Sequence, residues 1–298
     1  MSGIDAIGGT PVVRLDSART GEVWVKLEGA NPTGSYKDRM ALAMIRAAEA
    51  DGRLAPGQAV VEYTGGSTGS SLAFVCAVTG HPLRIVSSDA FATEKIRTMR
   101  AFGADVELIH SPGGITPDLI PSMVRRAGEI ARETGAFATD QFNNADMIAG
   151  YRRLGEELLE QVPDIAAFCC YVGTAGCFLG TSRALRDKLP DLHRVVLEPA
   201  ESPVLSGGQA GTHRIEGGGI GYWPPQLRAE DFDEVMAIPE ADGFAMARRA
   251  ARSDGIFSGP STGVNLVAAL RLAERLGDRV VTIQVDSGLK YLSGDLYG

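Results

Sequence analysis

Short runs of apolar residues alternate with longer amphipathic stretches along the chain. We predict strands over the apolar runs at 23–27, 59–63, 83–86, 105–109, 167–172, 194–197 and 280–285. We predict helices over 37–50, 70–79, 93–102 and around 181–189. Buried strands that alternate with helices are typical of proteins with mostly parallel sheets. The pattern therefore predicts the α/β fold class.

Glycine-rich turns follow several of these predicted strands. They lie at 28–35, 64–69 and 173–177, and a further glycine-rich segment spans 216–221. None matches the G-x-G-x-x-G pattern of dinucleotide-binding folds or the G-K-[ST] ending of a P-loop. Turns of this kind bring backbone N–H groups to the N-termini of the helices that follow, where anions bind. They indicate a ligand that carries phosphate or carboxylate groups.

Lys37 is the sharpest candidate for covalent chemistry. It follows a Gly-Ser-Tyr turn and opens a predicted helix. The partial positive charge of a helix N-terminus disfavours an ammonium group, which helps to lower the pKa of a lysine that acts as nucleophile and base. On the pattern alone, a surface lysine that happens to begin a helix explains Lys37 equally well. Lys26, in the middle of a predicted strand, has no comparable setting.

Charge and composition exclude several classes of function. The chain of 298 residues has a net charge of −8 and no basic block, so we expect no nucleic-acid partner. We expect no membrane partner, because no apolar run reaches the roughly 18 residues that span a bilayer. The histidines and cysteines lack the spacing of metal ligands, so no metal is predicted. Unpaired cysteines and an N-terminus without signal-peptide features predict a cytoplasmic protein.

The order of these motifs resembles that of the fold-type II enzymes that use pyridoxal 5′-phosphate (PLP), which are tryptophan synthase β-like. The chain is most similar to cysteine synthases (O-acetylserine sulfhydrylases) and the related cystathionine β-synthases, from residues 7–15 to residues 286–293. The resemblance implies two α/β domains with PLP in the cleft between them. The smaller would span 35–140 and move on closure, and the larger would combine 1–34 with 141–298. A homodimer is also implied.

The resemblance assigns roles to individual residues. In that family the lysine of the N-P-T-G-S-x-K-D-R motif carries PLP as a Schiff base, and Lys37 occupies its place. Ser287 matches the serine that hydrogen-bonds the pyridine nitrogen, and Ser67 stands where the family has an asparagine that contacts the 3′-oxygen. The implied phosphate loop consists of Gly173, Thr174, Ala175, Gly176 and Cys177. The implied residues for the substrate carboxylate are Thr64, Gly65, Thr68 and Gln141.

These roles imply a reaction on the β-carbon of an amino acid. A neutral serine at the ring nitrogen leaves the ring unprotonated and favours loss of a β leaving group, which gives α-aminoacrylate. The resemblance therefore implies β-substitution on a serine derivative such as O-acetylserine, with sulfide or a related nucleophile, to give cysteine or an analogue. Two alternatives stay open: β-elimination, as in serine/threonine dehydratases or cysteine desulfhydrases, and a weakly catalytic paralogue that acts as a scaffold. Gly65, Ser67 and Cys177 depart from the family pattern and leave the substrate open.

Overall fold

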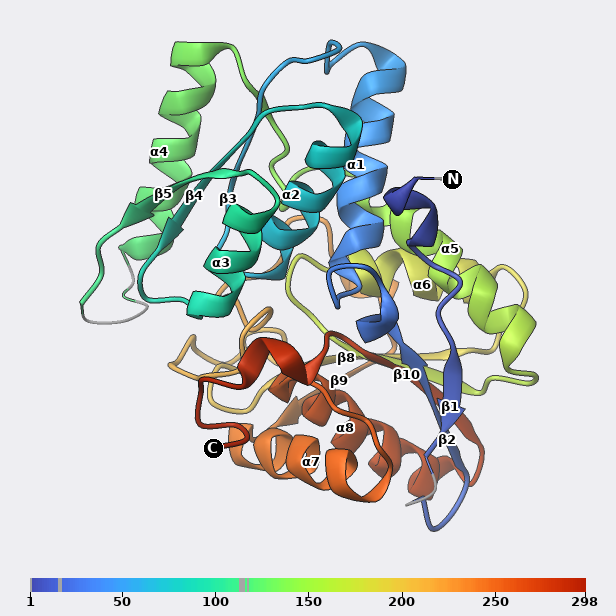
Figure 1. Cartoon of the computed structure of the whole chain (residues 1–298). Coiled ribbons are helices and arrows are strands. Elements are labelled where there is room, and N and C mark those ends of the chain that lie inside the picture. The colour runs from blue at the N-terminus through green and yellow to red at the C-terminus, as the bar shows by residue number, and fades with distance from the viewer. Residues whose placement is uncertain (1, 16–17, 113–115, 117) are drawn as a thin grey trace.

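The computed structural model describes residues 2–15, 18–112, 116 and 118–298. Two sheets form its framework (Figure 1). The larger sheet has the order β1 (Val12–Arg14), β2 (Glu22–Leu27), β10 (Arg279–Gln284), β7 (Ala167–Tyr171), β8 (His193–Pro199) and β9 (Glu234–Ile238). The smaller sheet has the order β5 (Asp105–Ile109), β4 (Leu83–Ser88), β3 (Val60–Tyr63) and β6 (Phe137–Ala138). Among the described strands, β1 runs antiparallel to β2 and the other pairs are parallel.

Helices cover both faces of each sheet. They are α1 (Lys37–Asp51), α2 (Ser67–Thr79), α3 (Thr93–Ala101), α4 (Leu119–Thr134), α5 (Asp146–Gln161), α6 (Gly176–Arg186), α7 (Glu240–Ser253) and α8 (Pro260–Leu276). In the described part of the chain, no helix has both the length and the apolar character needed to cross a bilayer.

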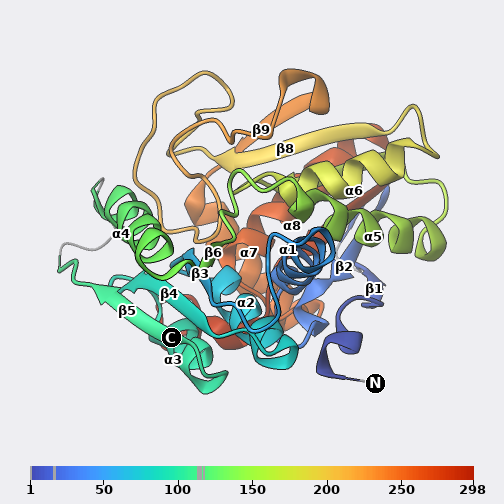
Figure 2. The same ribbon diagram turned by 90° about the horizontal axis from the view of Figure 1, so that it is seen from above.

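Alternate residues of each strand belong to different cores, as the pleat of a strand requires. In β10, Val281 packs into the core that contains α5 and α6, whereas Val280 packs into the core that contains α8. In β3, Val60 joins the first of these cores and Val61 packs against α4. Figure 2 shows α1 between α2 on one side and α5 and α6 on the other, so one core connects the two sheets.

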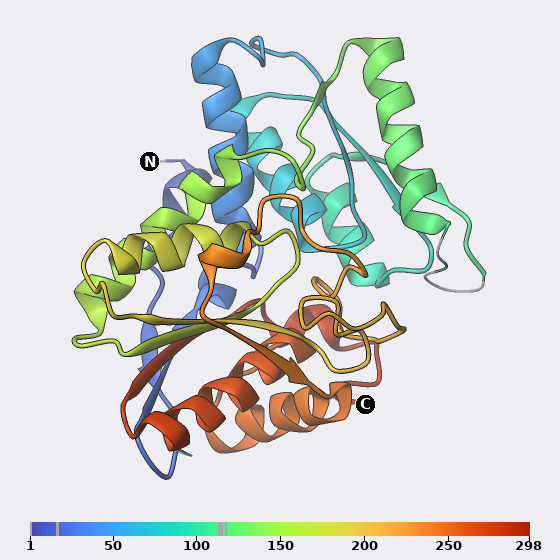
Figure 3. The same cartoon turned by 180° about the vertical axis from the view of Figure 1, so that it is seen from behind.

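The loops that could carry chemistry leave the carboxyl ends of parallel strands. β3 leads into 64–66, β7 into 172–175 and β10 into 285–287. In folds of this class, ligands bind beside the carboxyl ends of the strands. The irregular chain between β8 and β9 lies beside the half of the molecule that contains the smaller sheet (Figure 3).

The predicted α/β class with mostly parallel sheets is confirmed, and each predicted strand is present within two residues of its expected ends. The helix expected around 181–189 instead spans Gly176–Arg186. Its start was misplaced because the glycine-rich run was assigned to a loop. Likewise α2 begins at Ser67 rather than at residue 70. In both cases the glycine-rich motif itself forms the first turn of the helix.

Candidate active site

Lys37 is the first residue of α1, and its side chain is buried inside the molecule. Only 6% of the residue is exposed. Its Nζ lies 3.9 Å from Sδ of Met40 and 5.0 Å from the centroid of the Tyr36 ring. Burial lowers the pKa of Lys37 to about 8, although the nearby ionisable groups of Cys177 and Glu62 oppose this shift. Lys37 therefore has the buried setting and the lowered pKa of an amine that reacts near neutral pH.

A pairing of two distant segments fixes the turn before Lys37. The backbone N–H of Ser287 donates to the carbonyl of Gly34 over 2.9 Å, and the N–H of Tyr36 donates to the carbonyl of Val285 over 3.1 Å. Gly34 has a φ of 74°, and a Cβ added there would lie 3.3 Å from Cβ of Ser287. The left-handed backbone and this close approach explain the glycine. The pairing holds Lys37 beside the loop that follows β10.

The segment from Gly173 to Cys177 is buried and leads into α6, which begins at Gly176. Ala175 has a φ of 68°, the left-handed conformation found in backbone nests that bind anions. Within the described residues, the N–H groups of Gly173, Thr174 and Ala175 donate to no acceptor of the chain. A Cβ at Gly173 would lie 2.3 Å from the carbonyl oxygen of Gly217. Free N–H groups at a helix N-terminus fit the phosphate of PLP.

The predicted carboxylate-binding residues lie together. The hydroxyl of Thr68, at the start of α2, donates to Oε1 of Gln141 over 2.8 Å, although the two residues are 73 positions apart. Thr64, Thr68 and Gln141 are all buried. A Cβ at Gly65 would lie 2.3 Å from the ring of Phe91, so Phe91 fills the space where a larger residue would stand.

Glu62 holds the segment that carries Gln141. Its Oε2 accepts from the hydroxyl of Thr139 over 2.7 Å and from the backbone N–H of Gln141 over 3.1 Å. Burial raises the pKa of Glu62 to about 7, although these hydrogen bonds oppose the shift. The carboxyl group fixes the backbone of Gln141 and leaves its side chain directed at Thr68.

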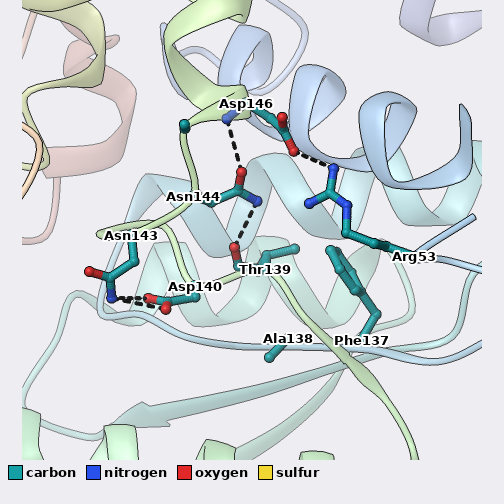
Figure 4. Close-up of a pocket in the computed structure, with 9 residues that line it drawn as sticks. Arg53, Phe137, Ala138, Thr139, Asp140, Asn143, Asn144 and Asp146 are labelled. Atoms are coloured by element: carbon teal, nitrogen blue, oxygen red, sulfur yellow. Dashed lines mark hydrogen bonds and ion pairs between the residues drawn. The ribbon is translucent and has the colours of Figure 1, made fainter. Parts of the chain in front are cut away.

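A polar cavity of about 340 Å³ lies next to the same segment (Figure 4). Its polar groups are engaged with one another. Arg53 pairs with Asp146 over 2.7 Å, and the side-chain amide of Asn144 donates to the carbonyl of Thr139 over 3.0 Å. We interpret these contacts as structural support for the segment around Gln141, because they occupy the polar groups to which a ligand would otherwise bind.

Ser67 and Ser287 each have a hydrogen-bond partner within the chain. The hydroxyl of Ser287 accepts from the N–H of Leu289 over 3.3 Å, and Lys290 Nζ donates to Oγ of Ser67 over 3.4 Å. The roles of both serines towards the cofactor stay predictions.

Ser261 is a candidate that the sequence analysis missed. It lies in the first turn of α8, 1% exposed, and within the described residues its hydroxyl has no hydrogen-bond partner. The neighbouring Thr262 accepts from the N–H of Val285 over 3.0 Å, so Ser261 lies beside the segment that pairs with the turn before Lys37. A buried hydroxyl without a partner fits a polar atom of a bound cofactor. The available signal was the Gly-Pro-Ser-Thr-Gly run that opens this helix.

In the described residues, no group of three or more His, Cys, Asp or Glu side chains is placed to bind a metal ion. All four cysteines are free and buried.

Residues 4–286 match the family model described as "Pyridoxal-phosphate dependent enzyme". The chain therefore belongs to the PLP-dependent enzyme family, and PLP is its cofactor. It is 39% identical over 299 residues to a cysteine synthase of Staphylococcus aureus (strain N315), an alignment that covers 98% of this chain and 95% of that protein. Within the family, the protein is a transferase of the cysteine synthase type.

Solved structures of similar proteins support this class. The structure of O-acetylserine sulfhydrylase isoform 3 from Entamoeba histolytica matches with a TM-score of 0.92 at 35% identity, over 99% of this chain and 90% of that one. A hydrogen sulfide-producing enzyme from Fusobacterium nucleatum matches with a TM-score of 0.90 at 36% identity, over 98% of this chain and 99% of that one. The expected fold-type II architecture is thereby confirmed.

Proposed function

We propose that this protein replaces the β-substituent of an activated serine derivative, with O-acetyl-L-serine as donor and sulfide as nucleophile, to form L-cysteine. The observation that carries the proposal is the position of Lys37. It is buried at the start of α1, and the turn before it is hydrogen-bonded to residues 285–287 at the carboxyl end of β10. The similarity to cysteine synthases and to an O-acetylserine sulfhydrylase supports the choice of donor.

PLP, when bound, supplies the electron-withdrawing ring that stabilises negative charge at Cα of the amino acid. The residues of the chain do the rest. Lys37 would hold the cofactor through Nζ, and the same Nζ, when free, would remove the proton from Cα of the substrate. The N–H groups of Gly173 to Ala175 would bind the phosphate.

Binding of the carboxylate positions the substrate for this proton transfer. We propose that Thr64, Thr68 and Gln141 bind it together with the backbone around Gly65. We also propose that 35–140 is the smaller domain, that 1–34 with 141–298 forms the larger one, and that the smaller domain closes over the bound amino acid. Such closure would exclude water from the reacting carbon.

β-Elimination is the second candidate, and one observation favours it. The Fusobacterium protein of 36% identity is named for the production of hydrogen sulfide, a product of elimination from cysteine. Elimination and substitution share the removal of the Cα proton by Lys37. They differ in whether the site retains the unsaturated product, left after the β-substituent departs, until a nucleophile arrives.

We expect O-acetyl-L-serine with sulfide to give L-cysteine at a steady rate, whereas O-acetyl-L-serine alone gives pyruvate only slowly. The reason is that the buried site excludes the water that would hydrolyse the product of elimination. Cysteine and pyruvate should be measured in the same reaction, with O-phospho-L-serine and L-serine as comparison donors. Fast pyruvate release that sulfide leaves unchanged would replace the proposal with β-elimination.

A serine hydroxyl faces the ring nitrogen in this proposal, and there are two candidates. The unpartnered hydroxyl favours Ser261 over Ser287. We expect Ser261→Ala to weaken PLP binding by about the worth of one neutral hydrogen bond, roughly 0.5–1.5 kcal/mol, and to shift the absorption of bound PLP. Ser287→Ala is the matched variant and should leave the absorption unchanged. The reverse result would assign the role to Ser287.

We further propose that the protein is a cytoplasmic homodimer. Four free, buried cysteines are consistent with a reducing compartment, in which thiols persist. Leu289 and Leu292, which are 64% and 56% exposed, are apolar side chains that a second copy could cover.

A further inference from the structure

Lys95 is a buried cation in the half of the molecule that contains the smaller sheet, and its side chain contacts residues of the other half. It lies on α3, and its side chain is 3% exposed. Its Nζ forms an ion pair with Glu216 of the glycine-rich segment that follows β8, and lies 4.8 Å from the centroid of the Tyr291 ring. The side chain therefore contacts both the segment that follows β8 and the segment that follows β10.

The ammonium group of Lys95 faces the predicted carboxylate loop. A Cβ added at Gly66 would lie 3.9 Å from Lys95 Nζ. None of the loop's own side chains is charged, and two of its donors have acceptors within the chain. The N–H of Gly66 donates to Oγ1 of Thr64 over 3.1 Å, and the hydroxyl of Thr68 donates to Gln141. Lys290 Nζ donates to Ser67 of the same loop over 3.4 Å, so a carboxylate that enters here has two ammonium groups nearby. Lys95 is the one of the two that is paired with a partly exposed carboxylate.

The two partners of the ion pair differ in their access to water. The side chain of Glu216 is 31% exposed, whereas that of Lys95 is 3% exposed. A buried ammonium is costly without a counter-ion, but a partly exposed carboxylate can turn towards solvent at little cost. The anion paired with Lys95 can therefore be exchanged.

The other charged groups around Lys95 do not take the place of Glu216 as the anion that a ligand could displace. Asp286, on the segment after β10, accepts from the hydroxyl of Tyr291 over 2.7 Å, and its other oxygen is buried without a hydrogen-bond partner in the described residues, so this carboxylate cannot turn towards solvent. Lys290 is engaged with Ser67. Glu94 lies next to Lys95 on α3. Of the carboxylates near Lys95, Glu216 is the one that forms an ion pair with it in the described structure.

We propose that Lys95 binds the α-carboxylate of the amino-acid substrate and that Glu216 occupies this position until the substrate displaces it. This inference rests on the proposed function, because it names a further binding residue for the same substrate. It adds a charged contact, which is stronger than a neutral one, to the hydrogen bonds of the Thr64–Thr68 loop. It also explains why an acidic residue stands opposite the loop.

The test compares L-serine with ethanolamine, which has the same amine and hydroxyl but no carboxylate. Both are titrated into the holoenzyme and followed by the absorption of bound PLP. We expect Lys95→Met to raise the dissociation constant of L-serine about 10- to 100-fold and to change that of ethanolamine less than about 2-fold. Glu216→Gln should act in the opposite direction and tighten L-serine binding about 3- to 10-fold, because Lys95 is then free.

Two variants serve as controls. Arg97→Met removes an exposed positive charge from the same helix and should change neither ligand. Thr68→Val removes a neutral donor and should weaken L-serine selectively. If Lys95→Met and Glu216→Gln weaken both ligands alike, the pair is only a structural bridge and the proposal is wrong. If Lys95→Met weakens the binding of L-serine but not of ethanolamine, and the sulfide assay nevertheless yields no cysteine, the proposed reaction is wrong. The carboxylate-binding role of Lys95 is then still supported.

Discussion

Reduction of the purified protein with borohydride will fix PLP covalently on Lys37, so that the peptide containing Lys37 gains the mass of the reduced cofactor. The chain has five lysines to distinguish, namely Lys26, Lys37, Lys95, Lys188 and Lys290. Lys26 forms an ion pair with Glu157, Lys95 pairs with Glu216, and Lys290 donates to Ser67. Lys37 Nζ instead lies against the thioether of Met40 and the ring of Tyr36. Lys37 is therefore the buried lysine whose amine is available for covalent chemistry. Peptide mass spectrometry after reduction will locate the label.

Replacement of this lysine should remove activity while the fold persists. We expect Lys37→Ala to lower turnover of O-acetyl-L-serine about 10²- to 10⁴-fold, the usual contribution of a proton-transferring side chain, with further loss because PLP is no longer held covalently. Exposed Lys188→Ala is the matched control and should keep full activity. A label on Lys95 or Lys290, or an active Lys37→Ala variant, would overturn the assignment.

The lowered pKa of Lys37 gives a second readout of the same site. Only the neutral amine attacks the aldehyde of PLP, and burial brings the pKa of Lys37 down to about 8. In the apoprotein the neutral fraction is therefore high above pH 8 and falls about tenfold for each unit below it. The rate of PLP capture should follow this curve, whereas an exposed lysine with a pKa near 10.4 would still be mostly protonated at pH 9.

The parts of the site predictable from sequence are those encoded within a few consecutive residues. The turn before Lys37 and the glycine-rich run at 173–177 are local, because their glycines and the following helix starts are contiguous in the chain. The prediction that anions bind at helix starts came from these runs, and the free N–H groups of Gly173 to Ala175 fit it. The roles of individual residues came instead from the family resemblance.

The parts that escaped prediction depend on long-range contacts. Lys95 and Glu216 are separated by 121 residues, and nothing local to either marks the pair. Ser261 was missed for another reason. α8 is buried around most of its surface, between the larger sheet and α7, so its residues lack the one-sided apolar pattern that identifies a helix. Lys26 was seen only as a lysine within a strand, and its buried partner Glu157 is distant in the chain.

Loss of Arg39 should destabilise the protein more than any surface change, because Arg39 is the centre of a buried ion network. Its guanidinium donates to Glu28 through Nε over 2.7 Å and to Glu157 over 2.8 Å, and Lys26 pairs with Glu157 over 2.7 Å. The exposed fractions of the Arg39, Glu28 and Glu157 side chains are 2%, 0% and 6%. Arg39→Met leaves two buried carboxylates with one cation, which costs about 3–5 kcal/mol of unfolding free energy.

The comparison variant lies on the same helix. Arg46→Met removes an arginine that is 52% exposed and pairs with Glu49, so we expect a loss of about 1 kcal/mol or less. Urea unfolding should be measured with PLP at one saturating concentration, because a bound ligand adds its own stability. Equal effects of the two substitutions would show that the network contributes no more than a surface ion pair.

The same network makes a prediction about acid. Burial opposes the ionisation of Glu157, but hydrogen bonds from Arg39 and Lys26 outweigh it and lower the pKa of Glu157 to about 2, below the value of about 4.3 in an unfolded chain. The unfolded state therefore takes up the proton first as the pH falls. The stabilisation is complete above about pH 4.3 and is lost progressively towards pH 2. In Arg39→Met the pKa of Glu157 rises, so the unfolding free energy of this variant should depend less on pH across that window. Parallel pH profiles for the wild type and the variant would contradict the role of Arg39 in holding Glu157 ionised.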